Sequence, residues 1–274
     1  MEIFEALHSA AQNIGIPYFV IGAAARDLLF RYGYDLPVRR ATRDIDIAVR
    51  VADWDQHDRL VGALIATGNF EPTEIRQRYL FKGSETIDIV PFGPIAGKKH
   101  SIAWPPDENV VMGVLGFEEA FRSAIPLVVR REPLVSVPVA SLAGLAMMKL
   151  ISWDESYPRR AKDGQDCYYI TENYIDAGND GRLYDEAADL LAVESFDRAR
   201  AGARLLGRDM ARLVEGDAKQ KIREIIVRES DPAGQLKLIS DIVGADVFVE
   251  EKTNDIFVLL QSVRDGFLEG RRSR

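Results

Sequence analysis

The sequence predicts an α/β (α+β) domain followed by an all-helical C-terminal domain. Up to residue 138, short β-prone runs alternate with helical apolar spacing and with loops rich in proline and glycine. From residue 139 onward proline becomes sparse, and apolar residues recur at every third or fourth position. The 274 residues, 47% of them hydrophobic, suffice for two domains of ordinary size. We therefore expect domains at residues 1–138 and 139–274.

The first domain is expected to open with a helix, a strand and a second helix. Apolar residues at helical spacing predict a helix over residues 3–14, which Gly15 ends. The β-rich run 17–21 follows and leads into Gly22. Good helix formers without a breaker then continue to Arg31, so a helix should start directly from the strand end.

Alternation of polar and apolar residues predicts the later strands of this domain. Residues 44–51 show the two-residue period of a strand with one apolar face. A helix over residues 53–67 should cover the sheet. Further strands are expected at 78–82, 86–90, 126–131 and 133–137, with a loop at 91–108.

Helical periodicity alone predicts the second domain. Its apolar spacing predicts seven helices, at residues 139–153, 164–177, 182–192, 198–214, 217–228, 233–243 and 254–268.

Charge and cysteine content exclude several classes of protein. The 35 Lys and Arg against 43 Asp and Glu give a net charge of −8, which argues against broad non-specific binding of nucleic acid but allows a local basic groove. The single cysteine, Cys167, excludes an internal disulfide, and three scattered histidines exclude a His/Cys zinc site. No apolar run is long enough to span a membrane, and the acidic start does not resemble a signal peptide. We expect a cytoplasmic protein without a membrane partner, in which carboxylates hold any metal.

Three aspartates are the candidate metal ligands. Asp44 and Asp46 lie two positions apart in one predicted strand, so both project from the same face. Their mutual repulsion is relieved by a cation, and Mg²⁺ prefers carboxylate oxygens. Asp88 stands between Ile87 and Ile89 of another predicted strand; if the strands pair, three carboxylates converge and suit two metal ions. The structural alternative is a polar strand face, although aspartate is disfavoured within strands.

The turn at Gly22 and Ala23 is a candidate phosphate site. Small residues between a strand and a helix let backbone N–H groups approach a phosphate, and the helix N-terminus favours the negative charge. A glycine at such a place also serves simply to turn the chain.

These segments together resemble the nucleotidyltransferase superfamily of DNA polymerase β, whose pattern is a strand, a small-residue turn with a helix, an Asp-x-Asp strand and a third aspartate. The likeness is carried by Val20-Ile21-Gly22-Ala23-Ala24-Ala25-Arg26-Asp27, Thr42-Arg43-Asp44-Ile45-Asp46-Ile47 and Ile87-Asp88-Ile89-Val90. The resemblance implies a nucleotidyltransferase domain with a mixed sheet. It implies that two Mg²⁺ or Mn²⁺ ions bind Asp44, Asp46 and Asp88, that Asp88 accepts a proton, and that the nucleotide binds at Gly22, Ala23 and Arg26. Ala23 stands where the family usually has a second glycine or a serine.

The second half is similar to the AbiEii/AbiGii-like nucleotidyltransferases, the toxins of type IV toxin–antitoxin systems. Residues 147–153 (Met-Met-Lys-Leu-Ile-Ser-Trp) resemble the lysine motif, and residues 159–166 (Arg-Arg-Ala-Lys-Asp-Gly-Gln-Asp) the Arg-x-Lys-Asp-x-x-Asp motif. The resemblance implies that Lys149 approaches the triphosphate, that Asp163 is needed for activity and that Asp166 helps to bind the nucleotide. From the residues alone, Lys149 could equally be a solvated helix lysine, and both aspartates could be helix N-terminal residues that interact with the dipole.

The function implied is transfer of a nucleoside monophosphate from a nucleoside triphosphate to a hydroxyl of tRNA, protein or a small molecule, with an antitoxin protein as partner. Two alternatives stay open. One is an aminoglycoside-type small-molecule nucleotidyltransferase, since an acidic protein suits a cationic acceptor. The other is a catalytically silent homologue that binds nucleotides or a partner. Arg26-Asp27 also resembles CCA-adding enzymes and poly(A) polymerases, whose Arg-Arg-Asp-Phe motif is absent.

Overall fold

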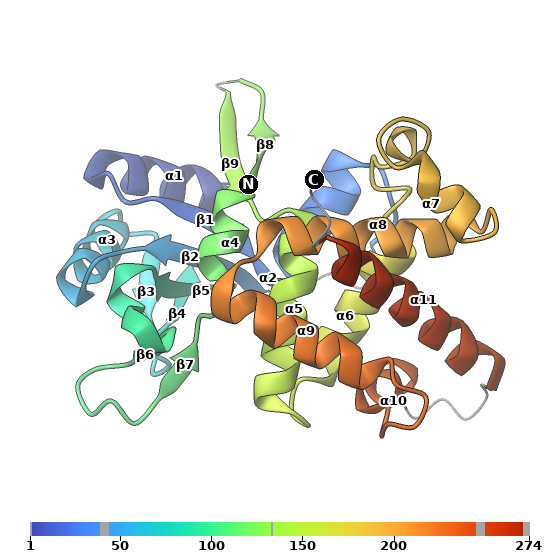
Figure 1. Cartoon of the computed structure of the whole chain (residues 1–274). Coiled ribbons are helices and arrows are strands. Elements are labelled where there is room, and N and C mark those ends of the chain that lie inside the picture. Colours follow the sequence, from blue (N-terminus) through green and yellow to red (C-terminus); the bar gives the residue numbers. More distant parts are fainter. Residues whose placement is uncertain (1, 39–43, 133, 245–249, 271–274) are drawn as a thin grey trace. The chain divides into compact units, whose positions relative to one another are not determined.

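The computed structural model describes residues 2–38, 44–132, 134–244 and 250–270 (Figure 1). Thr42 and Arg43 of the quoted motif therefore lie outside the described residues. The chain divides into two compact units, Met1–Gly33 with Pro37–Ser141 and Tyr34–Leu36 with Leu142–Arg274. The boundary expected after residue 138 stays a prediction. The sequence did not predict that Tyr34–Leu36 would pack within the second unit.

A seven-stranded mixed sheet forms the centre of the first unit, in the order β3-β4-β5-β2-β1-β9-β8. Strand β2 is antiparallel to β1 and parallel to β5, and β1 is parallel to β9. The mixed sheet agrees with the expected fold class. The strands are β1 (Tyr18–Ile21), β2 (Asp44–Arg50), β3 (Phe70–Pro72), β4 (Arg78–Phe81), β5 (Glu85–Phe92), β8 (Ile125–Arg130) and β9 (Val135–Val139).

The helices of this unit bury apolar faces against the sheet and one another. Helix α1 (Glu2–Ile14) contacts α3 (Trp54–Ala66), and each also contacts a strand of the sheet. Helix α2 (Gly22–Leu28) starts directly from β1, packs against β1 and β2, and continues into the π-helical turn η1 (Leu29–Gly33). The helix–strand–helix opening is thus confirmed.

The loop expected over residues 91–108 was wrong in part. It contains the end of β5, the 3₁₀ helix η2 (Pro94–Lys99) and strand β6 (Ser101–Ala103), which pairs with β7 (Val111–Gly113). Strand β3 and the short helix α4 (Phe117–Arg122) were also missed. Strands β3, β6 and β7 have three residues each, too few to show a period of two in the sequence. Their extended conformation depends on the strands with which they pair.

The second unit is helical, as predicted. Its long helix α5 (Leu142–Ser156) is buried on nearly all sides and contacts α6, α8 and α9. The predicted helix at 182–192 is shorter, because residues 181–183 form the 3₁₀ helix η3 (Gly181–Leu183). The remaining helices are α6 (Ala161–Glu172), α7 (Ala188–Val193), α8 (Arg198–Leu213), α9 (Gly216–Glu229), α10 (Lys237–Val243) and α11 (Glu250–Glu269). Within the described part of the chain, no helix has both the length and the apolar character needed to cross a bilayer.

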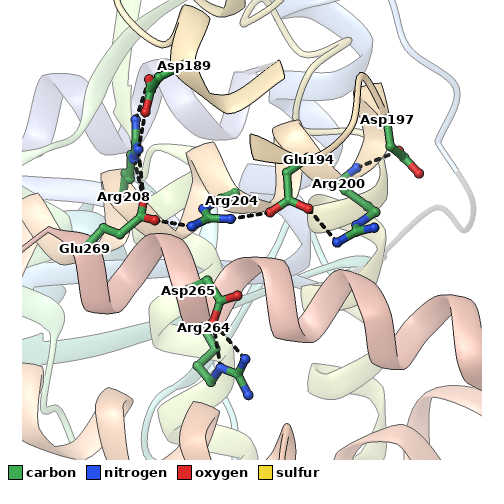
Figure 2. Close-up of polar contacts among 9 residues, drawn as sticks. All are labelled: Asp189, Glu194, Asp197, Arg200, Arg204, Arg208, Arg264, Asp265 and Glu269. Atoms are coloured by element: carbon green, nitrogen blue, oxygen red, sulfur yellow. Dashed lines mark hydrogen bonds and ion pairs between the residues drawn. The ribbon is translucent and has the colours of Figure 1, made fainter. Parts of the chain in front are cut away.

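Ion pairs link α7, α8 and α11 within this unit (Figure 2). Glu269 of α11 pairs with both Arg204 and Arg208 of α8. Arg208 also lies 2.6 Å from Asp189 of α7, and Arg204 lies 2.6 Å from Glu194 at the end of α7. The Glu194 side chain is only 2% exposed, and its carboxylate pairs with the arginines of α8 at positions 200 and 204.

Candidate functional site

The sheet places the three predicted aspartates on one face. Asp44 and Asp46 alternate with core residues of β2, and the register pairs Asp46 with Asp88 on the parallel strand β5. The side chains of paired residues on neighbouring strands project to the same side, so Asp88 shares the face of Asp44 and Asp46. The pairing of these two strands, on which the metal hypothesis depends, is therefore confirmed. Ile47, Ile87 and Ile89, which flank the aspartates, are fully buried, whereas Ile45 between Asp44 and Asp46 is half-buried.

The side chains of Asp44 and Asp88 differ in their exposure to solvent. The Asp44 side chain is 51% exposed, whereas that of Asp88 is 13% exposed. Asp44 lies at the start of β2 and Asp88 in the middle of β5, next to the hydrogen-bonded strand β4. The face therefore presents an open end at Asp44 and a covered end at Asp88.

Gly22 connects the glycine turn to the aspartate strand. Its backbone has a φ of +70°, a conformation that favours glycine, and the preceding Ile21 pairs with Asp46 across the sheet. A Cβ on Gly22 would lie 2.0 Å from Oδ2 of Asp46. The glycine is thus required so that the Asp46 carboxylate can lie against the turn, a role beyond the chain reversal that the sequence suggested.

Ala23 and Arg26 follow on α2. Ile21, at the helix N-cap, offers no side-chain bond to the first N–H groups of the helix. Arg26 is 3% exposed, and its guanidinium donates to Oδ1 of Asp27 at 2.6 and 2.8 Å. The structure therefore places Arg26 inside the fold beside Asp27, and its contact with a nucleotide stays a prediction.

Arg78 of β4 binds the third aspartate, a contact that the sequence analysis missed. Nε of Arg78 donates to Oδ1 of Asp88 at 2.8 Å, and Nη2 donates to Oδ2 at 2.9 Å. Nη2 also lies 4.0 Å from Oδ2 of Asp44. The bond to Asp88 holds the pKa of Arg78 above its usual value, and the charges of Asp44 and Asp46 act in the same direction.

A signal for this contact was present in the sequence. The turn around Gly83 joins β4 to β5, and counting outward from it pairs Phe81 with Glu85 and Arg78 with Asp88. Hairpin register follows from turn length, so a count of residues would have placed the arginine opposite the aspartate.

The aspartate face fits a divalent cation in donor type. Carboxylate oxygens on one solvent-reached face are the ligands that Mg²⁺ and Mn²⁺ prefer. Among residues 2–38, 44–132, 134–244 and 250–270, however, no three acidic, histidine or cysteine side chains are grouped closely enough to hold an ion jointly. Asp44 lies at the open end of the face and Asp46 lies against the Gly22 turn, whereas both oxygens of Asp88 are bonded to Arg78. The structure thus brings the three residues to one face without gathering their oxygens around one point.

Lys149, Asp163 and Asp166 form a buried cluster within the second unit. The ammonium of Lys149 on α5 donates to Oδ1 of Asp163 at 2.7 Å and lies 2.9 Å from Oδ2 of Asp166, both on α6. Arg160 also pairs with Asp163. Lys149 is 8% exposed, so it is not a solvated helix lysine. Asp163 lies in the first turn of α6, as the structural alternative expected, but Asp166 lies beyond it, and both carboxylates neutralise a lysine.

Within this cluster the opposite charges of the lysine and the aspartates keep both kinds of group ionised. Burial by itself lowers the pKa of Lys149, but the carboxylates of Asp163 and Asp166 outweigh it and raise that pKa. Burial likewise raises the pKa of Asp163, but Lys149 and Arg160 outweigh it and lower that pKa. Both groups are therefore charged near neutral pH, and removal of Lys149 takes away the cation that Asp163 and Asp166 share in a buried place.

One family model and several solved structures are similar to this chain. The family model "Nucleotidyl transferase AbiEii toxin, Type IV TA system" matches residues 20–237, which include every predicted site residue. Among solved structures, an antigenic nucleotidyltransferase-like protein from Paracoccidioides brasiliensis is similar at 15% identity and a TM-score of 0.42, over 70% of this chain and 89% of that one. The antibiotic-resistance factor ANT(2'')-Ia is similar at 14% identity and a TM-score of 0.34, over 70% of this chain and 94% of that one. No curated protein matches the sequence significantly.

Proposed function

The chain belongs to the AbiEii nucleotidyl transferase toxin family of type IV toxin–antitoxin systems, and we propose a metal-dependent reaction for it. In this reaction the nucleotidyltransferase moves a nucleoside monophosphate from a nucleoside triphosphate to a hydroxyl acceptor. The observation that carries the proposal is the shared face of Asp44, Asp46 and Asp88, with the Gly22 turn in contact with Asp46. Phosphoryl transfer needs little covalent chemistry from a protein, so positioning and charge neutralisation account for most of catalysis.

In the proposed reaction the acceptor oxygen attacks the α-phosphorus, and the bond to the pyrophosphate oxygen breaks. Asp44 and Asp46 would hold divalent metal, which when bound supplies positive charge to the triphosphate and the leaving pyrophosphate. Asp88 would join Asp44 and Asp46 in holding the metal and would take up the proton of the acceptor hydroxyl. The backbone N–H groups of Gly22 and Ala23 would bind the β- and γ-phosphates, an assignment supported by the lack of a side-chain cap at Ile21.

The buried cluster of the second unit has a supporting role in this proposal. The resemblance assigns Lys149 to the triphosphate, but its ammonium already has two carboxylate partners, Asp163 and Asp166. This arrangement supports a role in holding α6 against α5, so that loss of activity on substitution would follow from loss of local structure. Arg26, paired with Asp27, would likewise position α2 and its first N–H groups.

The biological role proposed is that of a toxin countered by an antitoxin protein, with tRNA or another hydroxyl compound as acceptor. Family membership supports this role. The net charge of −8 limits any RNA-binding surface to a local patch, since phosphate contacts need Lys and Arg.

The test is incorporation from labelled nucleoside triphosphates with Mg²⁺ into RNA, protein, aminoglycosides and other small alcohols. Asp46→Asn should reduce the rate more than about 100-fold, because loss of a metal ligand should cost more than loss of a group that only orients a ligand. Asp55→Asn, at an exposed position in the first turn of α3, is the matched control and should keep the rate. Equal activity of wild type and Asp46→Asn would contradict the mechanism.

The same assay separates the alternatives. Label on an aminoglycoside alone would favour small-molecule modification, and nucleotide binding without pyrophosphate release would favour the silent homologue. Expression of the wild type should arrest growth and Asp46→Asn should not. Rescue by the product of a neighbouring gene would identify the antitoxin.

A further inference from the structure

Arg78 stands where a cation is expected. It comes from β4, outside the motifs that carry the family resemblance, and its guanidinium bonds both oxygens of Asp88. The same guanidinium lies 4.0 Å from the carboxylate of Asp44. The side chain is 32% exposed, so it is partly covered but can move towards solvent.

The Arg78 guanidinium and a metal ion cannot bind the Asp88 carboxylate independently of each other. A bidentate guanidinium occupies one in-plane lone pair on each oxygen of Asp88, the two lone pairs that a metal ion chelated by both oxygens would use. An ion bound beside it would also meet the repulsion of a positive charge in a site that screens charges less than bulk water does. Loss of the bond would leave Asp88, 13% exposed, without this positive partner, so a divalent ion is the natural replacement.

We propose that Arg78 is an internal counter-ion that competes with divalent metal for Asp88. This inference rests on the proposed metal-dependent function. The aspartate face is stabilised by Arg78 in the absence of metal, and Asp88 becomes a metal ligand only when the Arg78 bond opens. Metal binding is therefore weakened by this arginine, whereas a merely orienting partner would strengthen it.

The direct test is Mn²⁺ binding, measured by calorimetry and by the electron paramagnetic resonance signal of free Mn²⁺, without nucleotide. Arg78→Gln should lower the Kd for Mn²⁺ about tenfold or more, since one charge-assisted competitor is removed. Arg78→Lys keeps the charge but loses the bidentate bond, so its Kd should lie between the two. Arg76→Gln makes the same charge change at an exposed neighbouring position and should leave the Kd unchanged.

A second measurement needs no substitution. The ¹⁵Nε resonance of Arg78 in the wild type should shift on addition of Mg²⁺ and lose its protection from exchange with water, because the Nε–H bond to Asp88 opens. This readout keeps the inference testable even if Arg78→Gln folds poorly.

The outcomes distinguish this inference from the proposed function. Mn²⁺ binding that is lost in Asp46→Asn but equal or weaker in Arg78→Gln would overturn the competition and leave the metal-dependent function standing. An unshifted Arg78 Nε signal in metal-saturated wild type would also overturn it. Absence of Mn²⁺ binding in wild type and Arg78→Gln alike would overturn both.

Discussion

Gly22 shows how one missing side chain joins two sequence motifs. Its positive φ and its contact with Asp46 both require glycine, whereas Gly15 meets only the first requirement. Gly15 has a similar φ of +72°, but nothing lies within 4 Å of a Cβ placed there. A substitution at Gly15 therefore tests backbone strain alone, whereas one at Gly22 tests strain together with displacement of the Asp46 carboxylate.

Gly22→Ala should lower nucleotide transfer at least about tenfold and the free energy of unfolding by about 1–3 kcal/mol, because the methyl group displaces Asp46 and the backbone is strained. Gly15→Ala should show a similar loss of stability with unchanged transfer. Urea denaturation and the transfer assay measure the two quantities. If both variants lost activity equally, strain alone would account for the effect.

At the scale of elements, α8 and α11 form the closest helix contact of the second unit. A Cβ at Gly266 would lie 1.9 Å from the carbonyl oxygen of Arg204, and one at Gly207 would lie 2.1 Å from that of Val263. Backbones this close require glycine on both helices. The approach also brings Glu269 to Arg204 and Arg208, so packing and ion pairs depend on the same spacing (Figure 2).

Gly266→Ala should force α8 and α11 apart and lower the free energy of unfolding by about 1–3 kcal/mol, the usual range for overpacking. Gly62→Ala is the matched control, since Gly62 lies in α3 with open space around its Cα. It should raise stability by about 0.5–1 kcal/mol, because alanine is the better helix former. Urea denaturation of both variants measures this, and a Gly266→Ala protein as stable as wild type would contradict the close contact.

At the scale of the whole molecule, each of the two units has a core of its own, and the predicted site residues are divided between them. The first contains the aspartate face, and the second contains the buried Lys149 cluster on α5 and α6. Cys167, the single cysteine of the chain, lies on α6 one residue after Asp166 and is buried. Burial raises the pKa of this thiol to about 12. Its reactivity therefore reports on the opening of the second unit.

Cys167 of the native protein should resist a thiol reagent near pH 8, where an ordinary thiol with a pKa of about 8.5 reacts. Lys149→Met leaves Asp163 and Asp166 buried without the lysine, at a cost of about 3–5 kcal/mol, so labelling should accelerate about 100-fold or more. Lys162→Met removes an exposed lysine of α6, the helix that contains Cys167, and should leave labelling slow. Rapid labelling of the wild type would contradict the buried thiol.

Much of the fold could be predicted because its signals are local. The helices of both halves and the strands at 44–50 and 85–92 follow from periodicities of 3.6 and 2, which depend only on neighbours in the chain. The three-residue strands β3, β6 and β7 could not be predicted, since three residues are too few to show a period of two and their conformation depends on pairing with a neighbouring strand.

For the candidate site, the sequence by itself determined the residue types and the face shared by Asp44 and Asp46, because alternation along one strand needs no partner. Only the tertiary structure decided that Asp88 lies in register with Asp46 and that Lys149 is buried between two carboxylates. The contact of Arg78 with Asp88 follows from the hairpin register, whereas the pairing of β2 with β5 and the burial of Lys149 depend on elements that become neighbours only when the chain folds.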